Sequence, residues 1–129
     1  MQIKPMKAIT SLLLFSSLSS PVFASDNDVN HLVQDTYKAG TKVEIDEDQD
    51  AVYAAVQNGL IRPFSELYAT IDKELNGRVI KVELDEDDDE WIYELKLVHD
   101  NNVIRVEYNA TTLELMEIRG RNIRGIIKK

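Results

Sequence analysis

The second half of the chain alternates hydrophobic and polar residues with a period of two, the spacing of a β-strand with one buried face. Three runs of strand length show this pattern, separated by short polar connections at residues 85–90 and 99–102. Such short connections predict antiparallel neighbours, because a parallel crossover needs about a dozen residues or more. A shorter fourth strand is predicted over 112–118, with a bulge where the alternation slips between Leu115 and Met116. The hydrophobic members of the three main runs are Ile80, Val82 and Leu84; Trp91, Tyr93, Leu95 and Leu97; and Ile104, Val106 and Tyr108.

Ahead of these runs, the hydrophobic residues follow the spacing of helices. A first helix is predicted from a cap at Asp50 to a stop at Gly59. A second begins at Pro63, which suits a first helical position, and ends at Asn76 and Gly77. The hydrophobic members are Val52, Ala55 and Val56 in the first helix, and Phe64, Leu67, Tyr68, Ile71 and Leu75 in the second.

Together these elements predict an α+β fold for residues 50–118. The strands have one hydrophobic face, which must be covered, and the second helix is the only amphipathic element long enough to cover it. We therefore expect a two-layer sandwich with helices packed on one face of a three- to four-stranded antiparallel sheet, in the order α-α-β-β-β-(β).

The first 24 residues differ from the rest and have the pattern of a secretory signal peptide. Lys4 and Lys7 precede a short apolar segment, and small residues stand at the positions that a signal peptidase reads. We expect cleavage between Ala24 and Ser25, export to the periplasm, and no membrane span afterwards, because the apolar segment is shorter than the ~20 residues that a bilayer requires. Residues 25–49 are predicted to be a flexible, acidic lead-in.

Charge and cysteine content exclude several classes of function. The chain of 129 residues has a formal net charge of −8, and loss of the signal, which carries two lysines and no acidic residue, makes the remainder more acidic. Nucleic acid and anionic membrane surfaces are therefore poor partners. The chain has no cysteine, which excludes thiol chemistry, iron–sulfur clusters and cysteine zinc sites.

Three segments resemble a known family when they are taken in order. Residues 51–67 read AVYAAVQNGLIRPFSEL, residues 76–84 read NGRVIKVEL, and residues 91–97 read WIYELKL. Their order and spacing resemble the PepSY domain of small periplasmic proteins, over residues 51–118. One departure is Leu113, where the family usually has glycine in its last turn. Because leucine does not easily adopt a positive φ, we expect a different turn there.

The resemblance implies a module without catalytic residues. PepSY domains occur in propeptides of secreted metallopeptidases, in envelope proteins and beside sensor kinases, where they are described as inhibitory or regulatory. The sequence agrees, since it contains no nucleophile–base pairing, phosphate loop or cofactor fingerprint. We therefore expect no enzyme activity and no cofactor.

Metal binding has only weak candidates, the acidic residues Asp85, Asp87 and Asp89. A calcium loop starting at Asp85 would need glycine at its sixth position and glutamate at its twelfth, and these positions hold Glu90 and Lys96. The alternative is a solvated acidic hairpin tip.

Two surfaces are candidates for binding a partner. The first is the outward sheet face, which is either a ladder of solvated ion pairs or a docking surface with apolar residues among its charges. The second is the basic tail, residues 119–129, which either folds back onto the acidic loops or binds an acidic partner. Candidate residues are Lys81, Glu83, Ile92, Glu94, Lys96, Arg105 and Glu107 on the sheet face, with Val79, Val98 and Val103 adding apolar area, and Arg121 and Arg124 in the tail.

These observations predict a periplasmic module that binds and modulates another envelope protein, either a peptidase or a sensor kinase. One alternative is a sensor domain that binds a small ligand or a cation through its acidic loops. Another is a structural homodimer that pairs through the open sheet face.

Overall fold

The computed structural model describes residues 31–129, so the predicted cleavage site at Ala24 and Ser25 lies outside the described residues. Within that range, no helix has the length and apolar character needed to cross a membrane. The elements follow in the order β1 (Lys42–Ile45), α2 (Gln49–Gln57), α3 (Phe64–Glu74), β2 (Arg78–Asp87), β3 (Glu90–His99), β4 (Asn102–Asn109) and β5 (Leu115–Arg119).

The α+β prediction is confirmed, but the sheet is larger than predicted. It has five strands in the order β1-β2-β3-β4-β5, and β2 to β5 form the expected antiparallel meander. The additional strand, β1, pairs parallel to β2 and makes the sheet mixed. It comes from the segment predicted to be a flexible lead-in. Val43 and Ile45 of β1 pack against the hydrophobic core beside Val82 and Leu84, which explains why this short segment joins the sheet.

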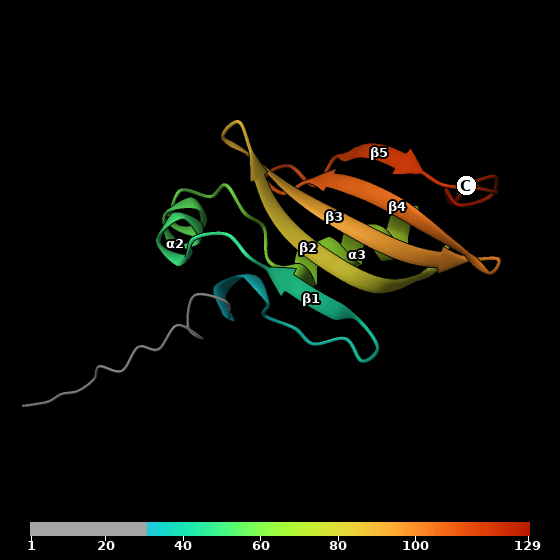
Figure 1. Cartoon of the computed structure of the whole chain (residues 1–129), viewed down its shortest axis with the longest axis horizontal. Helices are drawn as coiled ribbons and strands as arrows, with labels where there is room; N and C mark the ends of the chain where they lie inside the picture. The colour runs from blue at the N-terminus through green and yellow to red at the C-terminus, as the bar shows by residue number, and fades with distance from the viewer. Residues whose placement is uncertain (1–30) are drawn as a thin grey trace, which may run out of the picture.

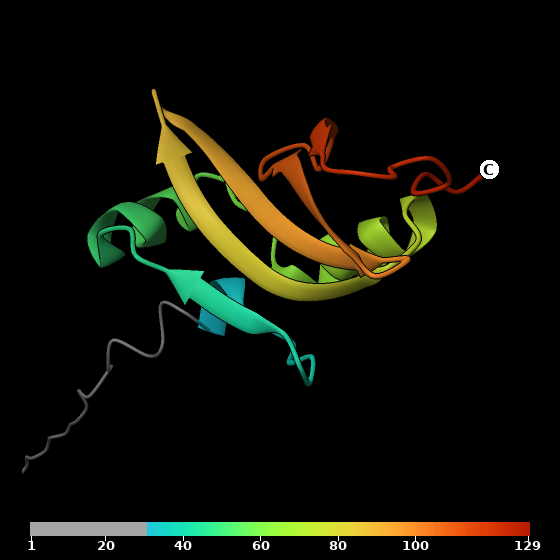
Figure 2. The ribbon, with the colours of Figure 1, turned by 45° about the vertical axis from the view of Figure 1, so that its right-hand side comes forward.

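Helix α3 covers the inner face of the sheet, which curves around it (Figures 1 and 2). Its hydrophobic stripe is buried as predicted, and the Phe64 ring meets the Tyr93 ring of β3 edge-on with centroids 5.7 Å apart. Helix α2 instead lies beyond one end of the sheet, so only one of the two predicted helices covers the face (Figure 1). Its cap is Asp48 rather than Asp50, since the Asp48 carboxylate accepts from the Ala51 N–H at 3.0 Å.

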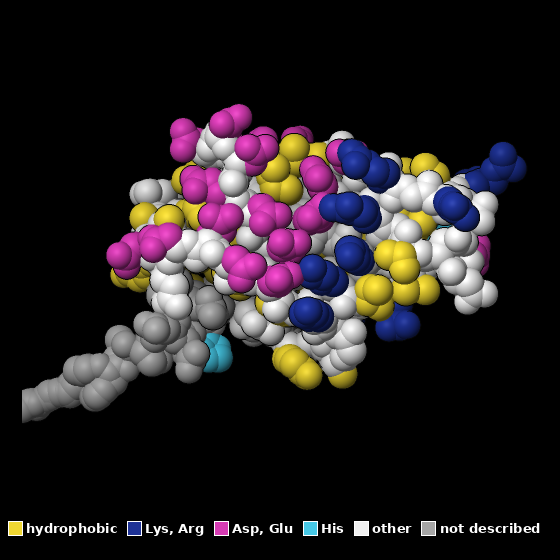
Figure 3. Space-filling view, in the orientation of Figure 1, with side chains coloured by type: hydrophobic (Ala, Val, Ile, Leu, Met, Phe, Trp, Pro, Cys, Tyr) yellow, Lys and Arg dark blue, Asp and Glu magenta, His cyan; other side chains and the backbone are white. Residues whose placement is uncertain are grey.

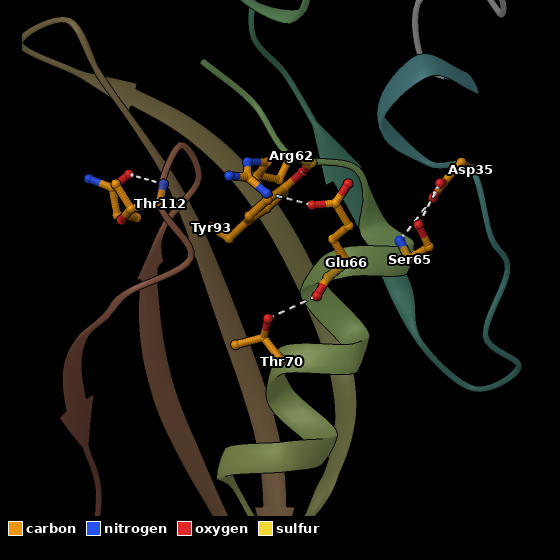
Figure 4. Close-up of polar contacts among 8 residues, drawn as sticks. Asp35, Arg62, Ser65, Glu66, Thr70, Tyr93 and Thr112 are labelled. Carbon is orange, nitrogen blue, oxygen red and sulfur yellow. Dashed lines mark hydrogen bonds and ion pairs between the residues drawn. The ribbon is translucent and has the colours of Figure 1, made fainter. Parts of the chain in front are cut away.

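The segment before β1 is attached to the start of α3 (Figure 4). Pro63 caps α3 but offers no side-chain hydrogen bond. The Asp35 carboxylate takes that role, accepting from the Ser65 backbone N–H at 2.9 Å and from the Ser65 hydroxyl at 2.6 Å. An acidic side chain also suits the positive end of the helix dipole. Val33, two residues earlier, is fully buried in the core.

Two tight hairpins fix the register of the central strands. The β2–β3 turn consists of Asp88 and Asp89, and the β3–β4 turn of Asp100 and Asn101, all four with φ between 51° and 65°. Two consecutive positive φ angles are the mark of the hairpin turns that match strand twist. The acidic stretch 85–90 is therefore mostly strand, and only Asp88 and Asp89 form the turn.

β-Bulges interrupt the alternation of inward and outward side chains at two places. The predicted slip near Met116 is confirmed, since Glu107 pairs with Glu117 whereas Tyr108 pairs with Leu115. A second irregularity, at Ile80 between Val79 and Lys81, is not visible in the sequence pattern. It turns Val79 into the core, where it is 3% exposed, so the expectation that Val79 lies on the outward face is wrong.

The last turn also differs from expectation. Leu113 adopts a φ of 61°, the left-handed conformation that we expected leucine to avoid. The turn is held by the Asn109 side chain, which accepts from the N–H groups of Thr111 and Thr112 at 2.8 and 3.0 Å. Leu113 also packs against the core, and that contact offsets the backbone strain.

The C-terminal segment, predicted to be a basic tail, packs against the end of α3. Ile126 is buried in the core, and its carbonyl accepts from the Asn76 N–H at 2.7 Å. The Lys128 N–H donates to the Glu74 carbonyl at 2.8 Å. The segment thus folds back, although onto the helix end rather than onto the acidic loops.

Candidate functional site

The outward face of the sheet carries a row of five cations, one from each strand. Directly paired residues share a face, and the register joins Lys42 to Lys81, Lys81 to Lys96, Lys96 to Arg105 and Arg105 to Arg119. We call this set the cationic row: Lys42, Lys81, Lys96, Arg105 and Arg119.

Two residues away from the cation in each strand, at the same face, lies a row of five glutamates. Each member again pairs directly with the next across the sheet. We call this set the glutamate row: Glu44, Glu83, Glu94, Glu107 and Glu117. The two rows lie side by side, and Figure 3 shows the result as an acidic region beside a stripe of basic side chains.

Ion pairs connect the two rows but do not follow the direct cross-strand pairing. Lys81 Nζ lies 2.8 Å from a Glu44 oxygen and 3.8 Å from a Glu83 oxygen. The bond to Glu44 raises the pKa of Lys81, and the same bond lowers the pKa of Glu44. Arg105 pairs with Glu94, and Arg119 pairs with Glu117.

The acidic side of the face holds more charge than these pairs neutralise. Carboxylate oxygens of Glu83, Asp85 and Glu94 lie within 4.8 Å of one another. Partial burial raises the pKa of Glu83, and the nearby Asp85 charge raises it further. Partial burial followed by the Glu94 charge does the same for the pKa of Asp85. Burial and the Glu117 charge raise the pKa of Glu107.

The structure brings seven predicted site residues together on this face: Lys81, Glu83, Ile92, Glu94, Lys96, Arg105 and Glu107. Val98 and Val103 pair directly beyond the cationic row, and Val103 is 54% exposed. Arg121 and Arg124 are exposed in the C-terminal segment, outside both rows.

The acidic residues proposed as metal candidates are not gathered at one point. Asp85 and Asp87 belong to β2, and Asp89 lies in the turn. The group that comes together is instead Glu83, Asp85 and Glu94. Calcium takes about six to eight oxygen ligands, and three carboxylates binding through one oxygen each would supply only part of that shell.

Sequence reasoning missed the outer members of both rows. Lys42 and Glu44 belong to β1, whose four residues alternate in charge and hydrophobicity, a short signal next to an acidic stretch. Arg119, which was predicted to begin the basic tail, belongs to β5 instead, and it lies beyond the bulge together with Glu117. Both pairs become visible only once the strand register is known.

The arrangement offers charge recognition rather than an enclosed cavity. The recess among Glu94, Arg105, Glu107, Glu117 and Arg119 has a volume of about 40 Å³. That is room for a water molecule, whereas small-molecule sites have ~300 Å³ or more.

A protein-family model described as the peptidase propeptide and YPEB domain, PepSY, matches residues 63–119. The matched segment contains α3 and the four antiparallel strands β2 to β5, and β1, α2 and the C-terminal segment lie outside it. No curated protein and no solved structure matches the chain.

Proposed function

Residues 63–119 of this chain form a PepSY domain, and from that premise we propose that the protein is a non-catalytic regulatory module that binds another exported protein. The family description, which names peptidase propeptides, supports a regulatory role of the propeptide kind. The N-terminal signal pattern supports a periplasmic location. A peptidase or the exported part of a sensor kinase is the partner class that we propose.

The observation that carries the proposal is the paired cationic and glutamate rows on an uncovered sheet face. The inner face of the sheet is buried beneath α3, whereas the two rows on the outward face carry ten exposed or partly exposed charges arranged by sign, with Val98 and Val103 beside them. Organised charge on an open face steers a partner of complementary potential and fixes its orientation.

Site-specific cross-linking in cells tests this proposal. A photoreactive amino acid placed at Lys96 or Val103 reports on the outward face, and the same group at Asp72, exposed on α3, reports on the opposite side. We expect an adduct with one exported protein from both sheet positions and none from Asp72, identified by mass spectrometry. The absence of any adduct, or identical adducts from both sides of the molecule, would count against the proposal.

A further inference from the structure

The direct cross-strand charge pairs of the outward face work against the stability of the sheet. Opposite charges on directly paired residues stabilise neighbouring strands, and like charges destabilise them. In both rows, every directly paired neighbour has the same sign. Exchanging Glu94 and Lys96 within β3 alone would turn the repulsive pairs that β3 makes in both rows into attractive ones. Direct cross-strand pairing therefore does not account for the separation of the charges into rows, although diagonal ion pairs join the rows.

The dimensions of the two rows match those of an α-helix lying across the strands. Neighbouring strands are about 4.8 Å apart, so five strands span roughly 19 Å, and residues two apart along a strand separate the rows by about 7 Å. A helix has a pitch of about 5.4 Å, close to the strand spacing, and a diameter of about 10–12 Å. Roughly 13 helical residues, between three and four turns, would therefore span the length of both rows. An extended strand repeats its side chains on one face about every 6.6–6.8 Å, which fits the strand spacing less well.

The curvature of the sheet favours the same kind of partner. The sheet bends around α3, so its outward face is convex along the strands (Figure 2). A rod that lies across the strands meets such a face along its ridge. Lys81, Glu94 and Arg105 stand near the middle of their strands, so the two rows follow this ridge. A second copy of the chain is a poorer occupant, because two convex faces touch only along a line and each chain carries a net charge of −8.

We propose that the two rows bind an α-helix of the partner, with its Lys and Arg residues over the glutamate row and its Asp and Glu residues over the cationic row. This inference rests on the proposed function and adds the chemistry of the partner. The two rows of opposite sign also determine the direction of the helix, since a helix turned end for end would place like charges over one another.

Two synthetic peptides of about 15 residues, a length at which alanine-rich sequences become helical, test the inference on the purified protein. The banded peptide carries Lys along one side of its helix and Glu along the adjacent side. The mixed peptide has the same composition, with Lys and Glu alternating on both sides. We expect the protein to bind the banded peptide at least about tenfold more tightly at low salt, and the preference to decline as salt shortens the Debye length.

A double exchange, Glu94→Lys with Lys96→Glu, provides the matched variant. It keeps the composition and the net charge but mixes the signs within both rows. We expect it to lose the preference for the banded peptide and to melt at the same or a higher temperature. The control exchange, Asp72→Lys with Lys73→Asp on the exposed side of α3, should retain the preference.

Each outcome has a definite meaning for the helix inference. Equal affinity of the wild-type protein for the two peptides would overturn it, and so would a preference that survives the double exchange. Light scattering that shows a wild-type dimer and a monomeric exchange variant would make a second copy the occupant and would also overturn it. If the peptides fail but the cross-linked adduct at Lys96 forms, only the helix inference fails. If no adduct forms either, the proposed function fails with it.

Discussion

The two faces of the sheet differ in the kind of side chains that lie next to one another across the strands. On the inner face, Val82, Leu95 and Val106 are direct neighbours across three strands, and each is fully buried. One residue away on the outward face, Lys81, Lys96 and Arg105 are direct neighbours with the same charge. Every contact on the inner face stabilises the fold, whereas the outward face retains repulsions that the fold tolerates. The difference indicates that the inner face determines stability, and it is consistent with the partner-binding role that we propose for the outward face.

Truncating Phe64, the aromatic residue at the start of α3, should have the largest effect on stability. Phe64 is fully buried and meets the rings of Tyr68 and Tyr93 edge-on. We expect Phe64→Ala to lower the free energy of unfolding by about 3–5 kcal/mol in urea denaturation. Its control on the outward face, Lys96→Ala, should change that free energy by less than about 0.5 kcal/mol. Similar losses from the two substitutions would mean that the faces do not differ as described.

Two adjacent isoleucines of the C-terminal segment differ in burial in the same way as the two faces of the sheet. Ile126 is 2% exposed within the core, whereas Ile127 is 53% exposed. We expect Ile126→Ala to lower the free energy of unfolding by about 2 kcal/mol. This is at the lower end for such a truncation, because the terminal segment can relax around the missing side chain. Ile127→Ala should stay within about 0.5 kcal/mol. Urea denaturation measures both, and an unchanged Ile126→Ala variant would show that the segment is not part of the core.

Neutralising the repelling carboxyls should produce a smaller change of the opposite sign. The raised pKa values of Glu83, Asp85 and Glu107 mean that folding disfavours their charged forms. The variant Glu83→Gln/Asp85→Asn/Glu107→Gln should therefore be more stable than wild type at neutral pH, by up to about 1 kcal/mol.

The sign of this effect sets its pH dependence. A carboxyl whose pKa is raised on folding favours the folded state while protonated and loses that contribution as the pH rises through the raised pKa. The advantage of the variant should thus shrink as the pH falls toward the ordinary values of 4.5 for Glu and 3.8 for Asp. Thermal melts across this range measure it, with Asp50→Asn/Asp72→Asn/Glu114→Gln, off the face, as the control of equal charge. A variant less stable than wild type at neutral pH would mean that these carboxyls stabilise the sheet.

The sequence predicts the inner face well because burial imposes periodicity. Residues such as Leu67 of α3 and Leu95 of β3 repeat at the spacing of their own element, and no tertiary information is needed to identify them. The outward rows depend on register, which the two-residue turns and the bulge at Ile80 determine. Neither hairpin turn contains the glycine that usually marks this turn type. Strand β1 was not predicted from the sequence, because it is only four residues long and its partner strand β2 lies far along the chain.

The parallel pairing of β1 has a consequence for the order of folding. The strands β2 to β5 are joined by hairpins and short turns, whereas the first pair of the parallel register links residue 42 to residue 81. Closing so long a loop costs more entropy than closing a two-residue turn, so we expect the meander to form early and β1 to join last. Until it does, the outer edge of β2 presents unpaired backbone groups, the kind of edge to which a strand from another chain can add. Strand β1 therefore protects that edge from pairing with other chains, and the domain acquires this protection only when β1 has joined the sheet.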